Sequence, residues 1–315
     1  MTRSLRAALA ATIIAFVVLV VIVDKQLWRA GSSTVPEASA AEPAGGDSIA
    51  IAASAVKSCV HEDGTHKIPC YEKILIPLVD QGGPKLAMGT LMQVSHADKE
   101  VQAFGHVYAH AIGIHAFDVD RNVERTFSSC NDAFQSGCYH GVIEAYFTHS
   151  SKVDTASVRQ LCVPWVQNGV YGWLRFQCMH GLGHGLTMWY QHDLVHALHD
   201  CDLLVENWDR ESCYGGAFME NVVDATEPDH GMPGMDMPNM ETKFKQIDKN
   251  DLNYPCTILP ERYLTTCYQN QVSIIMHFDD HEMPRVAHDC MNVPEQYRYM
   301  CFTGFGTDIN SFVVG

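Results

Sequence analysis

The amino-acid sequence predicts an all-α fold made of helix pairs that disulfide bridges clamp. Two observations lead to this prediction: the 12 cysteines fall into six successive close pairs, and a similar segment follows the second cysteine of each pair. The segments are CYEKI at Cys70, CYHGVIE at Cys138, CMHGLGH at Cys178, CYGGAFME at Cys213, CYQNQVS at Cys267 and CFTGFGT at Cys301. The shortest intervals between them are about 35 residues, which is typical of stacked helix-pair repeats.

The long interval between Cys70 and Cys138 has room for one more unit, FGHVYAH, in which Phe104 takes the cysteine position. We therefore expect about six or seven units in a solenoid-like or compact helical array. In each unit a first helix ends at the first cysteine, a loop follows, and a second helix starts at the second cysteine. This architecture resembles that of cysteine-rich helical-repeat proteins, in which helix pairs are also bridged.

Residues 1–29 are expected to contain a single N-terminal transmembrane helix. The run from Ala7 to Val23 has 17 residues, carries no charge and is mostly apolar, and charged residues flank it on both sides. This length is at the short end of the spanning range. A cleaved signal peptide is the alternative, but the small-x-small segment at 38–40 lies too far beyond the apolar run for a usual cleavage site. We favour an uncleaved anchor that attaches the protein to a membrane.

The rest of the chain divides by composition. Residues 30–55 are rich in Ala, Ser, Gly, Pro and Glu, which predicts a flexible linker. The Cys/His-rich helical-repeat domain is then expected at residues 56–315. The interval from Cys213 to Cys267 is longer than its neighbours and holds a Met-rich insert at residues 228–250.

The cysteines are expected to form disulfides, which place the domain outside the cytoplasm. All 12 follow the predicted anchor, and their even number and paired spacing suit an oxidising compartment, periplasmic or extracellular. Spacing favours the pairs Cys59/Cys70, Cys130/Cys138, Cys162/Cys178, Cys201/Cys213, Cys256/Cys267 and Cys290/Cys301, although the connectivity stays open. In the chain-entropy model, a bridge that closes a loop of about 10 to 15 residues stabilises the fold by roughly 3 kcal/mol.

The net charge of −16 narrows the range of partners. An acidic surface disfavours nucleic acid and anionic lipid, so we expect no nucleic acid partner. The expected partners are a metal ion and, through the anchor, a membrane; the sequence identifies no protein partner. The motifs C-x-x-C-H, H-E-x-x-H, G-x-S-x-G and G-x-x-x-x-G-K do not occur, which argues against covalent haem and against the common hydrolase and nucleotide-binding classes.

Three units carry pairs of metal-ligating residues four positions apart. They are His106/His110 in FGHVYAH, His140/Glu144 in CYHGVIE and His180/His184 in CMHGLGH. Residues four apart lie on one face of a helix, with Cβ atoms about 5 to 6 Å apart, so each helix can aim two ligands at one point. Few charged residues surround them, which predicts burial. A buried imidazole or carboxylate costs about 2 to 7 kcal/mol unless it is paired or bound to a metal.

The later units lack these side chains. They have Gly215, Gln269 and Thr303 two positions after the cysteine, and Met219, Ser273 and Thr307 six positions after it. The repeat therefore does not require histidine at these places. Its concentration in three successive units favours a localised metal centre over histidines that only pack or hydrogen-bond. Ligation by the neighbouring cysteines is a weaker alternative, because their even pairing predicts oxidised thiols.

The expected cofactor is a transition metal: copper, iron or zinc. Imidazole suits all three, and one carboxylate favours iron or zinc. Further candidate ligands are His115, Glu220, His230, Met232, Met235, Met237 and Met240. Glu220 is alternatively an outer carboxylate that orients a histidine, or a solvated side chain. The four methionines lie in the insert; exposed thioethers select Cu(I), although a Met-rich loop that packs on a neighbour explains them equally well.

Three functions stay open. The favoured one is a membrane-anchored extracytoplasmic metal-binding protein, a metalloenzyme with a mono- or dinuclear histidine-rich centre and redox or hydrolytic activity. In it Glu144 is a ligand or the catalytic general base. The second is a copper-handling protein whose Met-rich insert captures Cu(I). The third is a helical-repeat interaction scaffold with structural histidines.

Overall fold

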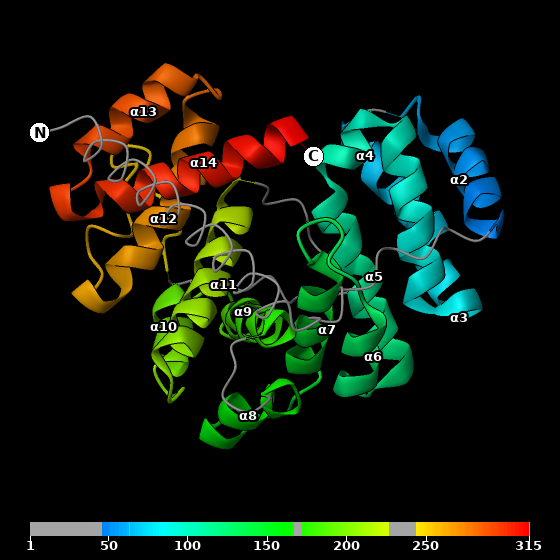
Figure 1. The fold of residues 1–315 in the computed structure, drawn as a ribbon, viewed down its shortest axis with the longest axis horizontal. Coiled ribbons are helices and arrows are strands. Elements are labelled where there is room, and N and C mark those ends of the chain that lie inside the picture. The colour runs from blue at the N-terminus through cyan, green and yellow to red at the C-terminus, as the bar shows by residue number, and fades with distance from the viewer. Residues whose placement is uncertain (1–45, 63, 167–171, 227–243, 315) are drawn as a thin grey trace, which may run out of the picture. The chain divides into compact units, whose positions relative to one another are not determined.

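The computed structural model describes residues 46–62, 64–166, 172–226 and 244–314, and most of these residues are helical (Figure 1). Within these ranges no strand occurs. The predicted all-α fold class is confirmed. The arrangement below concerns the unit that begins at Gly45.

A series of long helices runs through the chain, each packed against the next in sequence order. They are α3 (Gly64–Ala97), α5 (Gly105–Asp120), α7 (Gly137–Thr148), α9 (Trp173–Trp189), α11 (Asn207–Thr226), α12 (Glu261–Phe278) and α14 (Arg298–Val314). Figure 1 shows α9 between α7 and α11. Within α3 the helical path is interrupted at Gly83, whose φ of 73° lies in the left-handed region that favours glycine.

The helix α2 (Gly46–Cys59) precedes α3. Short helices connect the long ones: α4 (Lys99–Ala103), α6 (Val123–Ser129), α8 (Thr155–Gln160), α10 (Leu194–Cys201) and α13 (Met283–Asn292), with the 3-10 turns η1 (Val163–Trp165) and η2 (Glu295–Tyr297). Asn122 and Asp193 cap α6 and α10 by accepting hydrogen bonds from backbone N–H groups of the first turn. Such caps satisfy donors that the helix leaves unpaired.

All six predicted cysteine pairs form disulfides, with Cα–Cα distances between 5.6 and 5.8 Å. Each joins cysteines only 8 to 16 positions apart, and they indicate an oxidising, extracytoplasmic location.

The expected helix starts need correction in one respect. Except in α7, which begins at Gly137 just before Cys138, the second cysteine lies inside the long helix. For example, α11 begins at Asn207 and reaches Cys213 more than a turn later. Each bridge therefore ties a connecting segment to the body of the next long helix.

The predicted linker is corrected at its C-terminal end, because α2 begins at Gly46 rather than after residue 55. The segment IAIAASAV contains small apolar side chains at helical spacing, and Ala52 and Ala55 are buried in the core that α2 shares with α3. An Ala-rich composition suits a packed helix as well as a tether, since alanine has the highest helix propensity.

The predicted anchor at 1–29 and most of the Met-rich insert lie outside the described residues. Among the helices that the structure describes, none is both long and apolar enough to cross a membrane. The helix α11 ends at Thr226, and the described part of the insert, residues 244–250, contains no helix.

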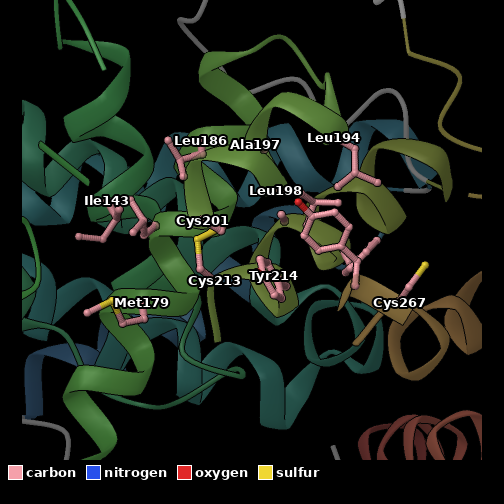
Figure 2. Close-up of a cluster of buried hydrophobic side chains, with 14 of the residues drawn as sticks. Ile143, Met179, Leu186, Leu194, Ala197, Leu198, Cys201, Cys213, Tyr214 and Cys267 are labelled. Atoms are coloured by element: carbon pink, nitrogen blue, oxygen red, sulfur yellow. A yellow bond between two sulfur atoms is a disulfide. The ribbon is translucent and has the colours of Figure 1, made fainter. Parts of the chain in front are cut away.

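The core between α9, α10 and α11 surrounds the disulfide Cys201–Cys213 (Figure 2). Apolar residues of α10 recur at positions i, i+3, i+4 and i+7, and this face is buried: Leu194, Ala197, Leu198 and Cys201. Each leucine contributes roughly 1.5 to 3 kcal/mol by leaving water. This packing fixes α9 against α11 and thereby positions one side of the candidate metal centre.

Glycines let the ligand-bearing helices approach backbone to backbone. A Cβ atom at Gly141 of α7 would lie 2.2 Å from the His110 carbonyl oxygen of α5, and one at Gly216 of α11 would lie 1.8 Å from the His180 carbonyl oxygen of α9. No side chain fits at such distances, so glycine is required at both positions. The close approach brings histidines on neighbouring helices within reach of one another.

Candidate metal centre

The six side chains that the sequence singles out lie together between α5, α7 and α9. The imidazole of His140 is central: its ring centroid lies 4.8 Å from that of His184, 4.9 Å from that of His180, and 5.5 Å from those of His106 and His110. The helical spacing explains the pairing within each helix, and the close helix contacts explain the meeting of the three helices.

Three overlapping groups within this cluster have ligand atoms within 4.8 Å of one another. They are His106/His110/His140, His140/His180/His184 and His110/Glu144/His184. Nitrogen and oxygen ligands lie about 2.0 to 2.2 Å from zinc, so two ligands of one ion are about 3 to 4 Å apart. The spacing within each group, at most 4.8 Å, is somewhat wider than that of ligands on a bound ion.

Three of the histidines use one ring nitrogen for a protein hydrogen bond. His106 donates from Nδ1 to the Phe134 carbonyl (2.9 Å), His140 from Nε2 to Gln177 Oε1 (3.0 Å), and His184 from Nδ1 to Glu220 Oε2 (2.8 Å). The other nitrogen of each ring, which then carries a lone pair, is buried and has no hydrogen-bond partner among the described residues. A metal-ligating histidine has this arrangement, because the outer hydrogen bond fixes the tautomer and orients the ring.

The carboxylate of Glu144 lies between two imidazoles. His110 donates from Nδ1 to its Oε2 (3.1 Å), and Nδ1 of His184 is 3.6 Å from its Oε1. Glu144 is 1% exposed, so this carboxylate has left water. Contact with imidazoles that can become charged or bind a cation offsets part of the cost of that burial.

Burial differs across the centre. His140, Glu144 and His184 are buried, whereas His106, His110 and His180 are partly exposed. An ion from solvent therefore meets the partly exposed histidines first, and the inner side chains are shielded from solvent. Electrostatic interactions are stronger in such a place than at the surface.

Four of the five imidazoles, those of His106, His140, His180 and His184, are neutral near pH 7. Burial, followed by the neighbouring His110, lowers the pKa of His106 to about 3. Burial and then the nearby imidazoles hold the pKa values of His140, His180 and His184 well below 6.5. Only neutral imidazole binds metal, so the structure keeps these ligands in the competent form.

A left-handed turn before α7 supplies one outer partner. Phe134, Gln135 and Ser136 have φ values of 53°, 52° and 66°. Non-glycine residues in this region cost about 1 to 3 kcal/mol each and occur where the surroundings impose them. Here the turn directs the Phe134 carbonyl to His106. Sequence reasoning did not find this turn, because none of its residues is glycine or asparagine.

Two more side chains of the site were missed. Gln177, one position before Cys178, accepts the hydrogen bond from His140. Met219 of α11 lies with its Sδ 3.4 Å from Nε2 of His180. The sequence carried a signal for Met219, because it occupies the same repeat position as Glu144 and His184. In the sequence analysis Met219 instead served as an example of a later unit that lacks histidine or carboxylate at this position.

The additional candidates divide into three groups. Glu220 lies in the centre as the hydrogen-bond acceptor of His184, in agreement with the interpretation of it as an outer carboxylate. His115 lies away from the three ligand groups and contacts Asp80 of α3 at 3.1 Å. The remaining candidates, His230, Met232, Met235, Met237 and Met240, lie outside the described residues.

A cavity of about 380 Å³ opens beside α9. It is lined by Arg159, Val166, Arg175, Met179, Leu204, Val205, Glu206 and Asp209, so none of the six clustered side chains is among its described lining residues. Arg175 and Asp209 form a buried bidentate ion pair there (2.9 and 2.7 Å), which neutralises both charges. The cavity is therefore distinct from the candidate metal centre.

No protein-family model matches the chain, and no curated protein or solved structure is detectably similar to it. The site therefore has to be interpreted from its own geometry and chemistry.

Proposed function

We propose that the protein is an extracytoplasmic transition-metal protein, a metalloenzyme whose mono- or dinuclear centre is held by His106, His110, His140, Glu144, His180 and His184. One observation carries the proposal. His106, His140 and His184 each give one ring nitrogen to an outer protein partner and keep the other buried without a hydrogen-bond partner in the described part of the chain. Histidines that serve only packing have no need for this repeated arrangement, and each lone pair left unsatisfied is a cost to the fold.

The metal is proposed to be functional rather than structural. Structural zinc sites are closed, have four ligands and supply the folding energy of small domains. Here six local disulfides already stabilise the fold, and the ligand set exceeds four. An excess of ligands with partly exposed histidines at one side suits a centre with an open position or a second ion.

His140 limits how the ligands are shared. It belongs to two of the three ligand groups but has one nitrogen left after its hydrogen bond to Gln177. It can therefore complete the His106/His110 group or the His180/His184 group, but not both together. Two ions require another donor at one end, and Glu144 or a further side chain has to supply it.

Glu144 is proposed to act mainly as a ligand or an orienting carboxylate. Its Oε2 accepts a hydrogen bond from His110, its Oε1 lies 3.6 Å from Nδ1 of His184, and the side chain is buried. A general base has to reach the proton of a bound water or substrate, directly or through one water. The general-base role is the alternative, and it requires water at the metal beside Glu144.

The membrane attachment and the copper-handling alternative rest on segments outside the described residues. The anchor at 1–29 is proposed from its apolar run, and the disulfides support a location outside the cytoplasm for the domain that follows. Copper capture by the insert at 228–250 is the second candidate function. Met219 favours it, since a thioether beside His180 adds a soft donor to the centre itself.

Elemental analysis of the full chain, purified without a His-tag from an oxidising compartment, tests the proposal. We expect about one or two equivalents of zinc, iron or copper in the wild type and in a His115→Ala control, whose histidine contacts Asp80 outside the centre. The double variant His140→Ala/His184→Ala should lose the metal. Less than about a tenth of an equivalent in the wild type after reconstitution would refute the proposal and favour the scaffold.

A further inference from the structure

We infer that Met219 is a metal ligand and that it forms, with His180 and His184, a soft end of the centre that takes Cu(I). This inference rests on the proposed metal centre and adds a ligand and a metal to it. The imidazole-rich end around His106 and His110 is then chemically different from the end on α9 and α11.

The spacing of the two donor atoms is that of ligands on one ion. His180 Nε2 and Met219 Sδ are 3.4 Å apart. A nitrogen about 2.0 to 2.1 Å and a sulfur about 2.3 Å from a tetrahedral ion lie about 3.5 Å from each other. An ion can therefore be placed between them with little movement of either side chain.

A hydrogen bond explains this contact less well. Thioether sulfur is a weak acceptor, so an N–H of His180 gains little by pointing at it. In the tautomer that carries its proton on Nδ1, Nε2 presents a lone pair to the sulfur, and two lone pairs that face each other are unfavourable without a cation between them.

The repeat also places Met219 at a ligand position. It lies six residues after Cys213, as Glu144 and His184 lie six residues after Cys138 and Cys178. The fourth unit thus continues the series with a soft donor. When His140 completes the His106/His110 group, Met219 supplies the third ligand for an ion at His180 and His184.

The donor set selects the metal. All 12 cysteines are in disulfides, so no thiolate from the described chain is available and any sulfur ligand is a thioether. Thioether and imidazole together favour Cu(I), whereas zinc and iron gain little from a thioether and prefer imidazole and carboxylate. Met219 is partly exposed, which leaves the sulfur accessible to an incoming ion.

The test measures Cu(I) affinity and copper X-ray absorption of the full chain under anaerobic conditions. Met219→Leu keeps the size and apolar character and removes the sulfur. Met179→Leu is the matched control, because Met179 lies on α9 one residue before His180 but is buried in the hydrophobic core, with 3% of its surface exposed. Both variants are also made in a chain that lacks residues 229–240, so that sulfur from the Met-rich insert is excluded.

We expect a sulfur shell at about 2.3 Å in the wild type and in Met179→Leu, in both backgrounds. Met219→Leu should lose that shell and bind Cu(I) at least about tenfold more weakly, with Zn(II) affinity unchanged within about twofold. Selenomethionine labelling gives a second readout without a substitution: copper–selenium scattering should persist in the chain without the insert.

In the chain that lacks residues 229–240, retention of the sulfur shell and of the Cu(I) affinity in Met219→Leu would overturn the inference. So would a shell that disappears with residues 229–240 and not with Met219→Leu. These results are distinguishable from failure of the proposed metal centre, in which the chain without residues 229–240 takes up neither Zn(II) nor Cu(I).

Discussion

Replacement of Gly141 by alanine tests how the helix contacts build the centre. The new Cβ would lie 2.2 Å from the His110 carbonyl oxygen, whereas ordinary van der Waals contact begins at 3.4 Å. The difference, 3.4 minus 2.2, requires α5 and α7 to separate by about 1.2 Å at this point. His110 and His140 lie on either side of the contact, so the ligand groups that join them should open.

The expected change in the free energy of unfolding combines a steric cost with a smaller gain from helix propensity. Overpacking of a tight contact costs typically about 1 to 3 kcal/mol, and the gain in helix propensity from glycine to alanine is at most about 1 kcal/mol. For a domain of this size each kcal/mol lowers the melting temperature by about 2 to 4 °C. We therefore expect a fall of several degrees and, because a shift of 1 Å misplaces ligands, a metal affinity at least about tenfold weaker.

Thermal unfolding of the metal-free protein and metal titration measure the two effects. Gly306→Ala on α14 is the control, since a Cβ there meets nothing within 4 Å. It should leave metal binding unchanged and leave the melting temperature equal or slightly higher. A Gly141→Ala protein with the melting temperature and the metal affinity of the wild type would refute the argument from close helix approach.

Three further predictions concern charge. Burial raises the pKa of Glu72 from 4.5 to about 7, so the folded state becomes less stable as pH rises from 4.5 to 7. The variant Glu72→Gln should therefore stabilise the fold by up to about 3 kcal/mol at pH 8 and not at all at pH 4. Denaturant titrations at both pH values measure the difference. The buried histidines stay neutral in the folded state and become protonated near pH 6.5 in the unfolded state. The metal-free protein should therefore lose stability steadily as pH falls below 6.5. A free energy of unfolding that does not change between about pH 7 and 5 would contradict this. Asp209→Ala removes the carboxylate that pairs with the buried Arg175 and should lower the free energy of unfolding by about 3 to 5 kcal/mol. Replacement of both residues by apolar ones should lower it much less. Equal decreases in the two variants would contradict this account of the ion pair.

Much of the centre was predictable because its information is local. Ligands four positions apart share a helix face whatever the tertiary structure, and their repetition after His106, His140 and His180 predicted three neighbouring helices. The pairing of successive cysteines was equally local. Both predictions needed only the helical period and the order of the units along the chain.

The missed features depend on contacts between helices. The hydrogen bond of Gln177 to His140 exists only because α9 packs on α7 in one register, and nothing in the segment around Gln177 marks it as a partner. The turn at 134–136 is imposed by its surroundings. Met219 was visible in the repeat but was counted among the side chains that replace the ligands in the later units. Part of α2 was assigned to the linker because an Ala-rich run does not reveal what it packs against.

The local disulfides have a consequence for how the protein is made. The cysteines are bridged in successive pairs along the sequence, and the partners are at most 16 positions apart. A chain delivered from its N-terminus into an oxidising compartment therefore presents each cysteine with its native partner before any competitor has emerged. Oxidation in order of arrival yields the correct connectivity, and it closes the loops leading into α7 and α9 while the C-terminal units are still to come.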